Sequence, residues 1–185
     1  STEGQFGEGI TFESWRNTLK EVGFTDLVEV GLGGDMTAYA EAAEWAEAYR
    51  EGKKLTTSCC PGFVNLIRLH YPDLIDNIST TVSPMCAVSR WIKSKDPEAV
   101  TVFVGPCIAK KSENILPTMN DAGTGRDVDL VLTTREFVRI LRAEHIRPDL
   151  LESTPFDDPI GEATGAGVIF GVTGGVMEAA LRSAY

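Results

Sequence analysis

Adjacent cysteines occupy the point where a predicted strand runs directly into a predicted helix. Residues 57–62 read TSCCPG; residues 54–57 are predicted as a strand, and Pro61 suits the first turn of the following helix. The helix dipole and the free backbone N–H groups of a first turn stabilise a thiolate. Because neighbouring side chains point in different directions, we expect one of Cys59 and Cys60 to bind a metal and the other to stay a reactive thiol. Two ordinary core thiols are the plainer alternative.

A further cysteine, Cys107, follows another predicted strand at residues 99–104. In a mostly parallel sheet, ligands gather beyond the carboxyl ends of the strands, so the two cysteine loops are expected to meet at one rim. Thiolates placed in this way hold iron–sulfur clusters. Lys110 lies one helical turn after Cys107, where its ammonium could donate a hydrogen bond to an anionic ligand beside a cluster. A solvated surface pair of Lys110 and Lys111 is the alternative.

Strands and helices alternate along the chain. Hydrophobic periodicity and capping signals predict helices over residues 11–22, 37–50, 61–70, 84–94 and 133–144 and a last helix ending at Tyr185, strands over 26–30, 54–57, 99–104 and 128–132, and a GLGGDMT loop at 31–37. Such alternation predicts an α/β fold, a mostly parallel sheet flanked by helices, in one domain over residues 1–185.

Charge and apolar patterning exclude several classes of protein. The net charge of −10 leaves no basic stripe to displace the counterions of a nucleic acid. No apolar run is long enough to span a membrane, and no signal-peptide pattern opens the chain, so a cytoplasmic protein is expected. The four cysteines lack the spacing of a zinc finger, and the fourth, Cys86, is expected to be a buried structural thiol.

The order of the motifs resembles the catalytic domain of the iron-only ([FeFe]) hydrogenases. TSCCPG is followed by PCIAKKSE at 106–113, as in the first two signature segments of that family. GGDMT at 33–37, the pair Ser83-Pro84, and FGVTGGVMEAALR at 170–182 also match, in the expected order. The resemblance runs from about Phe6 to Tyr185 and implies that the fold is part of the iron-only hydrogenase catalytic fold.

This resemblance assigns roles by position in the H-cluster, which joins a [4Fe–4S] cluster to a diiron subcluster. Cys60 and Cys107 match two ligands of the [4Fe–4S] cluster, and Cys59 matches the thiol that passes protons to the diiron part. Lys110 matches the residue that hydrogen-bonds an iron-bound cyanide. The expected lining of the diiron pocket is Pro84, Met85, Phe170 and Gly171.

The family's proton route also has candidates here, running from Cys59 to Glu41, Ser79 and Glu44. Glu41 and Glu44 are neighbours on one helix face, and Glu41 shares its face with Trp45. A carboxyl group beside apolar side chains has a raised pKa, as a proton relay requires. The alternative is a solvated acidic helix face, because the same helix carries further glutamates.

Parts of the family pattern are missing or altered. The third cysteine segment and the alanine-proline pocket segment do not occur, so the chain is expected to be a fragment with an incomplete ligand set for the H-cluster. Met85 and Cys86 replace two glutamines, and Gly105 replaces a methionine. These changes suggest a divergent subgroup.

The leading hypothesis is reversible reduction of protons to H2 by the parent protein. It implies an electron-transfer partner such as ferredoxin, H2 and protons as substrates, and H-cluster maturation proteins. The rival is a non-catalytic iron–sulfur assembly or sensory relative, and Cys59 favours the enzyme because assembly relatives typically lack that thiol. A third possibility is a domain whose four cysteines bind a [4Fe–4S] cluster alone.

Overall fold

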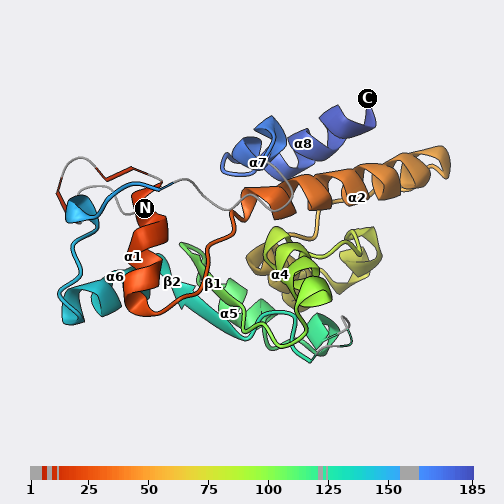
Figure 1. The fold of residues 1–185 in the computed structure, drawn as a ribbon. Helices are drawn as coiled ribbons and strands as arrows, with labels where there is room; N and C mark the ends of the chain where they lie inside the picture. Colours follow the sequence, from red (N-terminus) through yellow and green to blue (C-terminus); the bar gives the residue numbers. More distant parts are fainter. Residues whose placement is uncertain (1–5, 8–9, 12, 121–122, 124, 155–162) are drawn as a thin grey trace.

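A parallel sheet with helices on both faces organises the protein (Figure 1). The computed structural model describes residues 6–7, 10–11, 13–120, 123, 125–154 and 163–185. The helices are α1 (Ser14–Val22), α2 (Gly31–Arg50), α3 (Pro61–His70), α4 (Pro84–Lys95), α5 (Lys110–Glu113), α6 (Thr134–Ala143), α7 (Gly165–Ile169) and α8 (Gly175–Ala184). The strands are β1 (Val102–Gly105) and β2 (Leu130–Thr133), and the 3₁₀ turns are η1 (Pro72–Asn77), η2 (Pro117–Asn120) and η3 (Pro148–Leu150).

Alternate side chains of the two strands enter different cores. Strands β1 and β2 pair in parallel, with Val102 opposite Leu130. On one face Val104 and Leu132 pack against a cluster from α1 and α6. On the other face Phe103 and Val131 join Met85 and Cys86 of α4, with Val128. The predicted α/β class, a parallel sheet covered by helices on both faces, is therefore confirmed.

Two predicted strands do not form in the described part of the chain. Residues 26–30 adopt no strand, and the segment 54–57 makes only a single parallel bridge, from Thr56 to Ile78. A strand needs a hydrogen-bonded neighbour along its length, and local β propensity cannot supply one. The described sheet therefore has two strands, and Cys59 and Cys60 follow a bridge rather than a full strand.

The predicted loop at residues 31–37 is the first part of α2. Glycine weakens an isolated helix, but here the small residues permit close packing. A Cβ on Gly33 would lie 2.2 Å from the carbonyl oxygen of Pro84, and one on Gly34 would lie 3.2 Å from Gly167. Contacts with α4 and α7 therefore override the local preference and extend the helix to Gly31.

The carboxylate of Glu136 joins the start of α6 to α5, the short helix that follows β1. The predicted capping box is present, because Thr133 accepts from the backbone N–H of Glu136 and Glu136 accepts from that of Thr133. Glu136 also accepts a hydrogen bond from Lys111 of α5 at 2.9 Å. Together these interactions lower the pKa of Glu136 to about 2.

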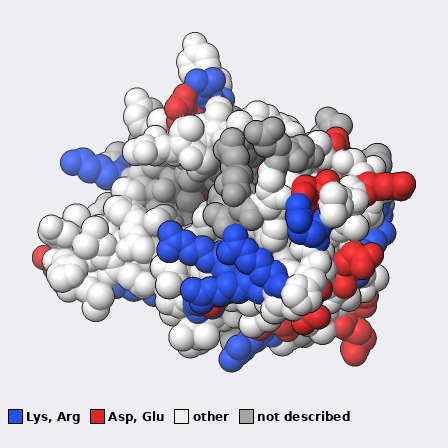
Figure 2. All heavy atoms as spheres, turned by 90° about the vertical axis from the view of Figure 1, so that its left-hand side faces the viewer, with Lys and Arg blue, Asp and Glu red and all other residues white. Residues whose placement is uncertain are grey.

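The molecule is not uniformly acidic at its surface. Figure 2 shows Lys and Arg side chains gathered on the face that includes α1 and α6. On α6 the residues Arg135, Arg139 and Arg142 are exposed at i, i+4 and i+7 spacing, which places them along one helix face. None of the described helices is both long and apolar enough to cross a bilayer.

Replacing Gly33 with alanine should destabilise the fold. The added methyl group would collide with the Pro84 backbone, and overpacking of this kind costs about 1–3 kcal/mol of unfolding free energy. Gly165→Ala is the matched control, because a Cβ there meets nothing within 4 Å. Urea unfolding of both variants would test this. Equal stability of Gly33→Ala and the wild type would contradict the close packing of α2 on α4.

Glu136→Gln should reduce stability at neutral pH and have a smaller effect in acid. Because the pKa of Glu136 is lowered in the folded state, its contribution is present above about pH 4.5 and is lost as the pH falls toward 2. Urea midpoints of the wild type and the variant, measured between pH 6 and pH 2.5, should therefore converge. The exposed Glu144 at the other end of α6 supplies the control, Glu144→Gln. A wild-type advantage that does not depend on pH would be inconsistent with this interaction.

Candidate functional site

The two adjacent cysteines have different surroundings. Cys60 is the N-cap of α3; it is exposed, and its Sγ accepts a hydrogen bond from the backbone N–H of Phe63 at 3.4 Å. Cys59 is half-buried. Burial raises the pKa of the Cys59 thiol to about 12, the charge of Glu41 adds to this shift, and Lys110 opposes it. The two thiols thus differ in exposure and surroundings, and the expected division into one metal ligand and one reactive thiol stays a prediction.

The two cysteine loops meet, as the sequence predicts. Cys107 is half-buried in the loop between β1 and α5. Lys110 at the start of α5 donates a hydrogen bond to the carbonyl oxygen of Cys59 at 3.0 Å. Further along, Asn65 of α3 donates to Ser112 of α5 at 3.4 Å. The packing of α5 on α3 therefore brings the segment that follows Cys107 against the loop that carries Cys59.

Lys110 is a buried ion-pair residue. It is 8% exposed, and its Nζ lies 2.7 Å from Oε2 of Glu113, which is itself 5% exposed. A buried ammonium needs such a partner, because an unpaired buried charge is strongly destabilising. Lys111 instead points to Glu136 and is about two-fifths exposed. The alternative of two solvated surface lysines is therefore wrong for Lys110.

Glu41 is buried beneath the cysteine loop. It is 2% exposed and accepts a hydrogen bond at 3.0 Å from the backbone N–H of Ser58, the residue before Cys59. Its Oε2 is buried and has no hydrogen-bond partner among the described residues. Burial raises the pKa of Glu41, and the hydrogen bonds from Ser58 offset only part of that shift. Glu47 on the same helix is exposed, so the acidic-face alternative applies to it and not to Glu41.

The pKa of Glu44 is lowered, whereas that of Glu41 is raised. Ser79 donates to its Oε2 at 2.5 Å, and the backbone N–H of Thr80 donates to Oε1 at 2.9 Å. Burial alone would raise the pKa of Glu44, but the hydrogen bonds from Ser79, Thr80 and Thr81 outweigh it and lower the pKa. The Ser79 hydroxyl also acts on Glu41 and lowers its pKa slightly. Ser79 therefore stands between two carboxyl groups with different proton affinities.

Helix α2 connects the other predicted pocket residues. Pro84 opens α4, and its carbonyl faces Gly33 of α2. Phe170 is half-buried at the end of α7, where its ring lies near Gly34 of α2. Gly171 follows it and is exposed. The described contacts do not join Phe170 and Gly171 directly to the cysteine loops.

The residues that differ from the family pattern lie in a packed core. Met85 is 2% exposed and belongs to the cluster of α4 with Val128 and Val131. Cys86 is fully buried, with its sulfur 3.2 Å from that of Met119, which agrees with its expected structural role. A Cβ on Gly105 would lie 2.5 Å from the Phe103 ring, so that ring occupies the space of a side chain at 105.

Several residues of the site were not singled out from the sequence. They are Ser58, Thr80, Thr81 and Glu113. Glu113 follows Lys110 at i+3 spacing, a signal that indicates an ion pair on one helix. The three hydroxyl residues carry no comparable signal, because their contacts with Glu41 and Glu44 arise between segments far apart in the chain.

The thiols fit part of an iron–sulfur cluster. Thiolate sulfur is the usual ligand of such clusters; Cys60 offers an exposed thiol at the N-cap of α3, and Cys107 offers a half-buried thiol in the loop after β1. Within the described ranges no group of three or more His, Cys, Asp or Glu side chains could hold a metal ion. Cys60 and Cys107 are therefore two candidate ligands, fewer than the four that a [4Fe–4S] cluster takes.

Comparisons with known proteins agree with these motifs. A family model described as "Iron only hydrogenase large subunit, C-terminal domain" matches residues 1–185. Iron hydrogenase 1 from Clostridium pasteurianum is 39% identical over 97% of this chain and 33% of its own length. The periplasmic [Fe] hydrogenase large subunit from Nitratidesulfovibrio vulgaris is 37% identical over 90% of this chain and 42% of its own length.

Solved structures give the same result. A variant of apo [FeFe]-hydrogenase HydA1 from Chlamydomonas reinhardtii superposes with a TM-score of 0.80 and 33% sequence identity, covering 95% of this chain and 47% of that one. The chain thus spans less than half the length of these relatives. On its motifs, its fold and these matches, the chain belongs to the family of the iron-only hydrogenase large subunit, C-terminal domain.

Proposed function

We propose that this chain forms part of the H-cluster site of an enzyme that reversibly reduces protons to H2. The observation that supports this most is the contact between the cysteine loop and Glu41. Ser58 donates to a buried carboxyl group, and the next residue is the half-buried, protonated thiol of Cys59. A purely structural metal site needs cysteine ligands but no such connected proton-carrying groups.

Cys60 and Cys107 would hold the [4Fe–4S] cluster, and the remaining ligands would come from other parts of the parent protein. When bound, the H-cluster supplies the redox-active iron at which protons and electrons combine into H2. Lys110 would keep a buried positive charge beside the thiols, because Glu113 and the carbonyl oxygen of Cys59 accept hydrogen bonds from its ammonium group. Pro84, Met85, Phe170 and Gly171 are the proposed pocket residues. The divergent Met85 is compatible with a sensory variant of this site.

Protons would reach Cys59 through the carboxyl groups of α2. Glu44 receives protons at the more exposed end, Ser79 lies between the two carboxyl groups, and Glu41 lies under the cysteine loop. Different pKa values suit this order, because the buried Glu41 holds its proton more tightly than Glu44. Ferredoxin or another electron-transfer domain, and proteins that build the H-cluster, are the proposed partners. A cytoplasmic location remains a prediction.

Iron–sulfur assembly without H2 chemistry is the second candidate function. It is favoured by several relatives that are named as assembly factors, among them the "Cytosolic Fe-S cluster assembly factor NAR1" of Meyerozyma guilliermondii, which is 29% identical over 66% of this chain. Both functions require Cys60 and Cys107, so metal content alone does not separate them. Cys59 and Glu41 have a purpose only in the first function.

Cys59→Ala in the full-length parent protein should abolish most H2 evolution and leave the iron content unchanged. Loss of a positioned proton donor lowers rates by about a hundredfold or more. H2 evolution by gas chromatography and iron and sulfide analysis would test this. Cys86→Ala is the control, because that thiol is a buried core group. A wild-type protein that binds iron and sulfide but evolves no H2 would support assembly instead.

Glu41→Gln should slow H2 evolution by at least about tenfold, because an amide keeps the shape of the side chain but carries no transferable proton. Glu47→Gln on the exposed side of the same helix should leave the rate unchanged. Rates across pH, together with the solvent deuterium isotope effect, would be measured for both variants. An identical pH profile for Glu41→Gln and the wild type would remove Glu41 from the route.

A further inference from the structure

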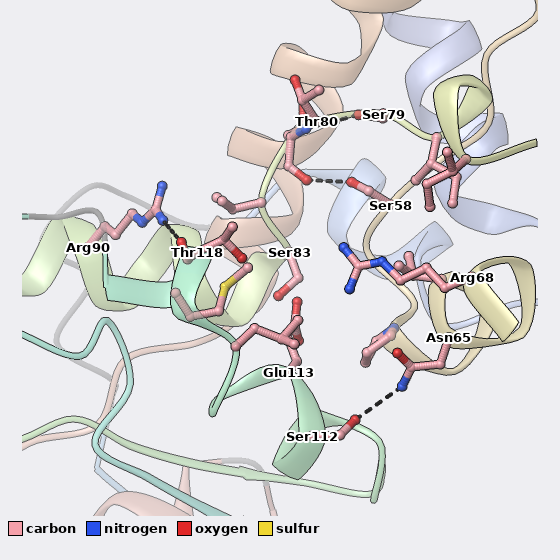
Figure 3. A pocket seen from close by; sticks show the side chains of 18 residues that line it. Ser58, Asn65, Arg68, Ser79, Thr80, Ser83, Arg90, Ser112, Glu113 and Thr118 are labelled. Carbon is pink, nitrogen blue, oxygen red and sulfur yellow. Dashed lines mark hydrogen bonds between the residues drawn. The ribbon is translucent and has the colours of Figure 1, made fainter. Parts of the chain in front are cut away.

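A cavity of about 420 Å³ lies beside the cysteine site. Its walls come from α3, α4, α5, η2 and the segment 78–83 (Figure 3). Cys59, Cys60, Cys107 and Lys110 are absent from its lining, but Ser58 and Pro61, which flank Cys59 and Cys60, belong to it, so the cavity adjoins the proposed cluster site. Glu113 is shared, because it lines the cavity and pairs with Lys110.

Most charges in the wall of this cavity are already balanced. Arg90 pairs with the buried Asp127 at 2.8 Å, and Glu113 pairs with Lys110 at 2.7 Å. Arg68 of α3 is different, because it makes no hydrogen bond or ion pair with any described residue. Figure 3 shows its guanidinium group pointing into the cavity, with Ser83 and Glu113 on the opposite side. One positive charge without a described partner, on a side chain that is also exposed to solvent, therefore faces the space.

A buried hydroxyl group is also available on that wall. Ser83 is 1% exposed, and its Oγ has no hydrogen-bond partner in the described part of the chain. The Cys86 thiol lies next to the Ser83 hydroxyl, but a thiol forms only weak hydrogen bonds and does not replace a full partner. A buried polar atom without a partner is destabilising by about 1–3 kcal/mol unless water or a ligand satisfies it. Ser83 lines the cavity, so a molecule in the cavity is the available partner.

The groups on the two sides impose opposite requirements on a ligand. Arg68 can only donate hydrogen bonds, so it calls for an acceptor, preferably an anionic one. Glu113 can only accept when ionised, and its Oε2 already accepts from Lys110, which leaves Oε1 for a donor on the ligand. Ser83 can do both. The apolar wall formed by Val64, Ile75 and Leu116 suits a short carbon skeleton.

We propose that this cavity binds a small carboxylic acid that carries an amino or hydroxyl group. Its carboxylate lies against Arg68, and its amino or hydroxyl group donates toward Glu113 and Ser83. No cysteine takes part in this binding. The ligand would also lie beside Ser58 and Ser79, which line the same cavity and bond to Glu41 and Glu44.

The test uses the 185-residue chain with L-lactate and L-serine as probes and acetate as the comparison. Isothermal titration should give a measurable millimolar dissociation constant for at least one probe and at least about tenfold weaker binding of acetate. Arg68→Gln should weaken binding at least about tenfold, since hydrogen bonds to charged groups are the strong ones. Ser83→Ala should weaken it several-fold, and Arg139→Gln on the distant α6 should have no effect.

Three results would overturn the proposal. The first is that neither probe binds, and the second is an unchanged affinity for the probes in Arg68→Gln. The third is that acetate binds as tightly as lactate, because the ligand would then need no hydrogen-bond donor. Urea unfolding of Arg68→Gln ensures that a lost signal is not lost folding. Cys59→Ala should bind the probes normally, so failure of the proposed hydrogenase function would leave this result untouched.

Discussion

The close approach of α2 to its neighbours determines where the rest of the site lies. Gly33 lies against the backbone at Pro84, and Gly34 lies against Gly167, so α4 and α7 pack on the first turns of the same helix. Two turns later the same helix carries Glu41 under the cysteine loop. Because a helix is rigid over this length, the packing at its start sets the position of the carboxyl group.

Electrostatic pairing then stabilises the polar interior. Lys110 is paired with Glu113, Arg90 with Asp127, and Lys93 with Asp129 at 2.9 Å. Lys110 and Glu113 lie on α5 after β1, whereas Asp127 and Asp129 lie just before β2 and join that end of the strand to α4. Glu41 is the exception, since hydroxyl and backbone N–H groups surround it instead of a cation. Burial raises the pKa of Glu41, and the hydrogen bonds from Ser58 offset only part of that shift.

Local sequence signals predicted the parts of this structure that depend on local interactions. The capping box at Thr133 and Glu136, the helix after Pro61 and the buried Cys86 all follow from short-range patterns. The predicted start of α2 was wrong. Glycines weaken an isolated helix, but here they are required because α4 and α7 pack closely against them in the folded chain. The same applies to Ser58 and Ser79, whose partners on α2 lie 17 and 35 residues away. The family resemblance supplied the expected roles of the cysteines, which spacing alone left open and which stay predictions.

The Phe103 ring beside Gly105 has an evolutionary consequence. The two residues lie two positions apart on β1, and the ring fills the volume where a side chain at 105 would begin. Glycine at this point is therefore not a simple loss of the family's methionine. A descendant of this protein could regain a methionine only together with a smaller or reoriented residue at 103. Residues 103 and 105 are therefore expected to change as a pair.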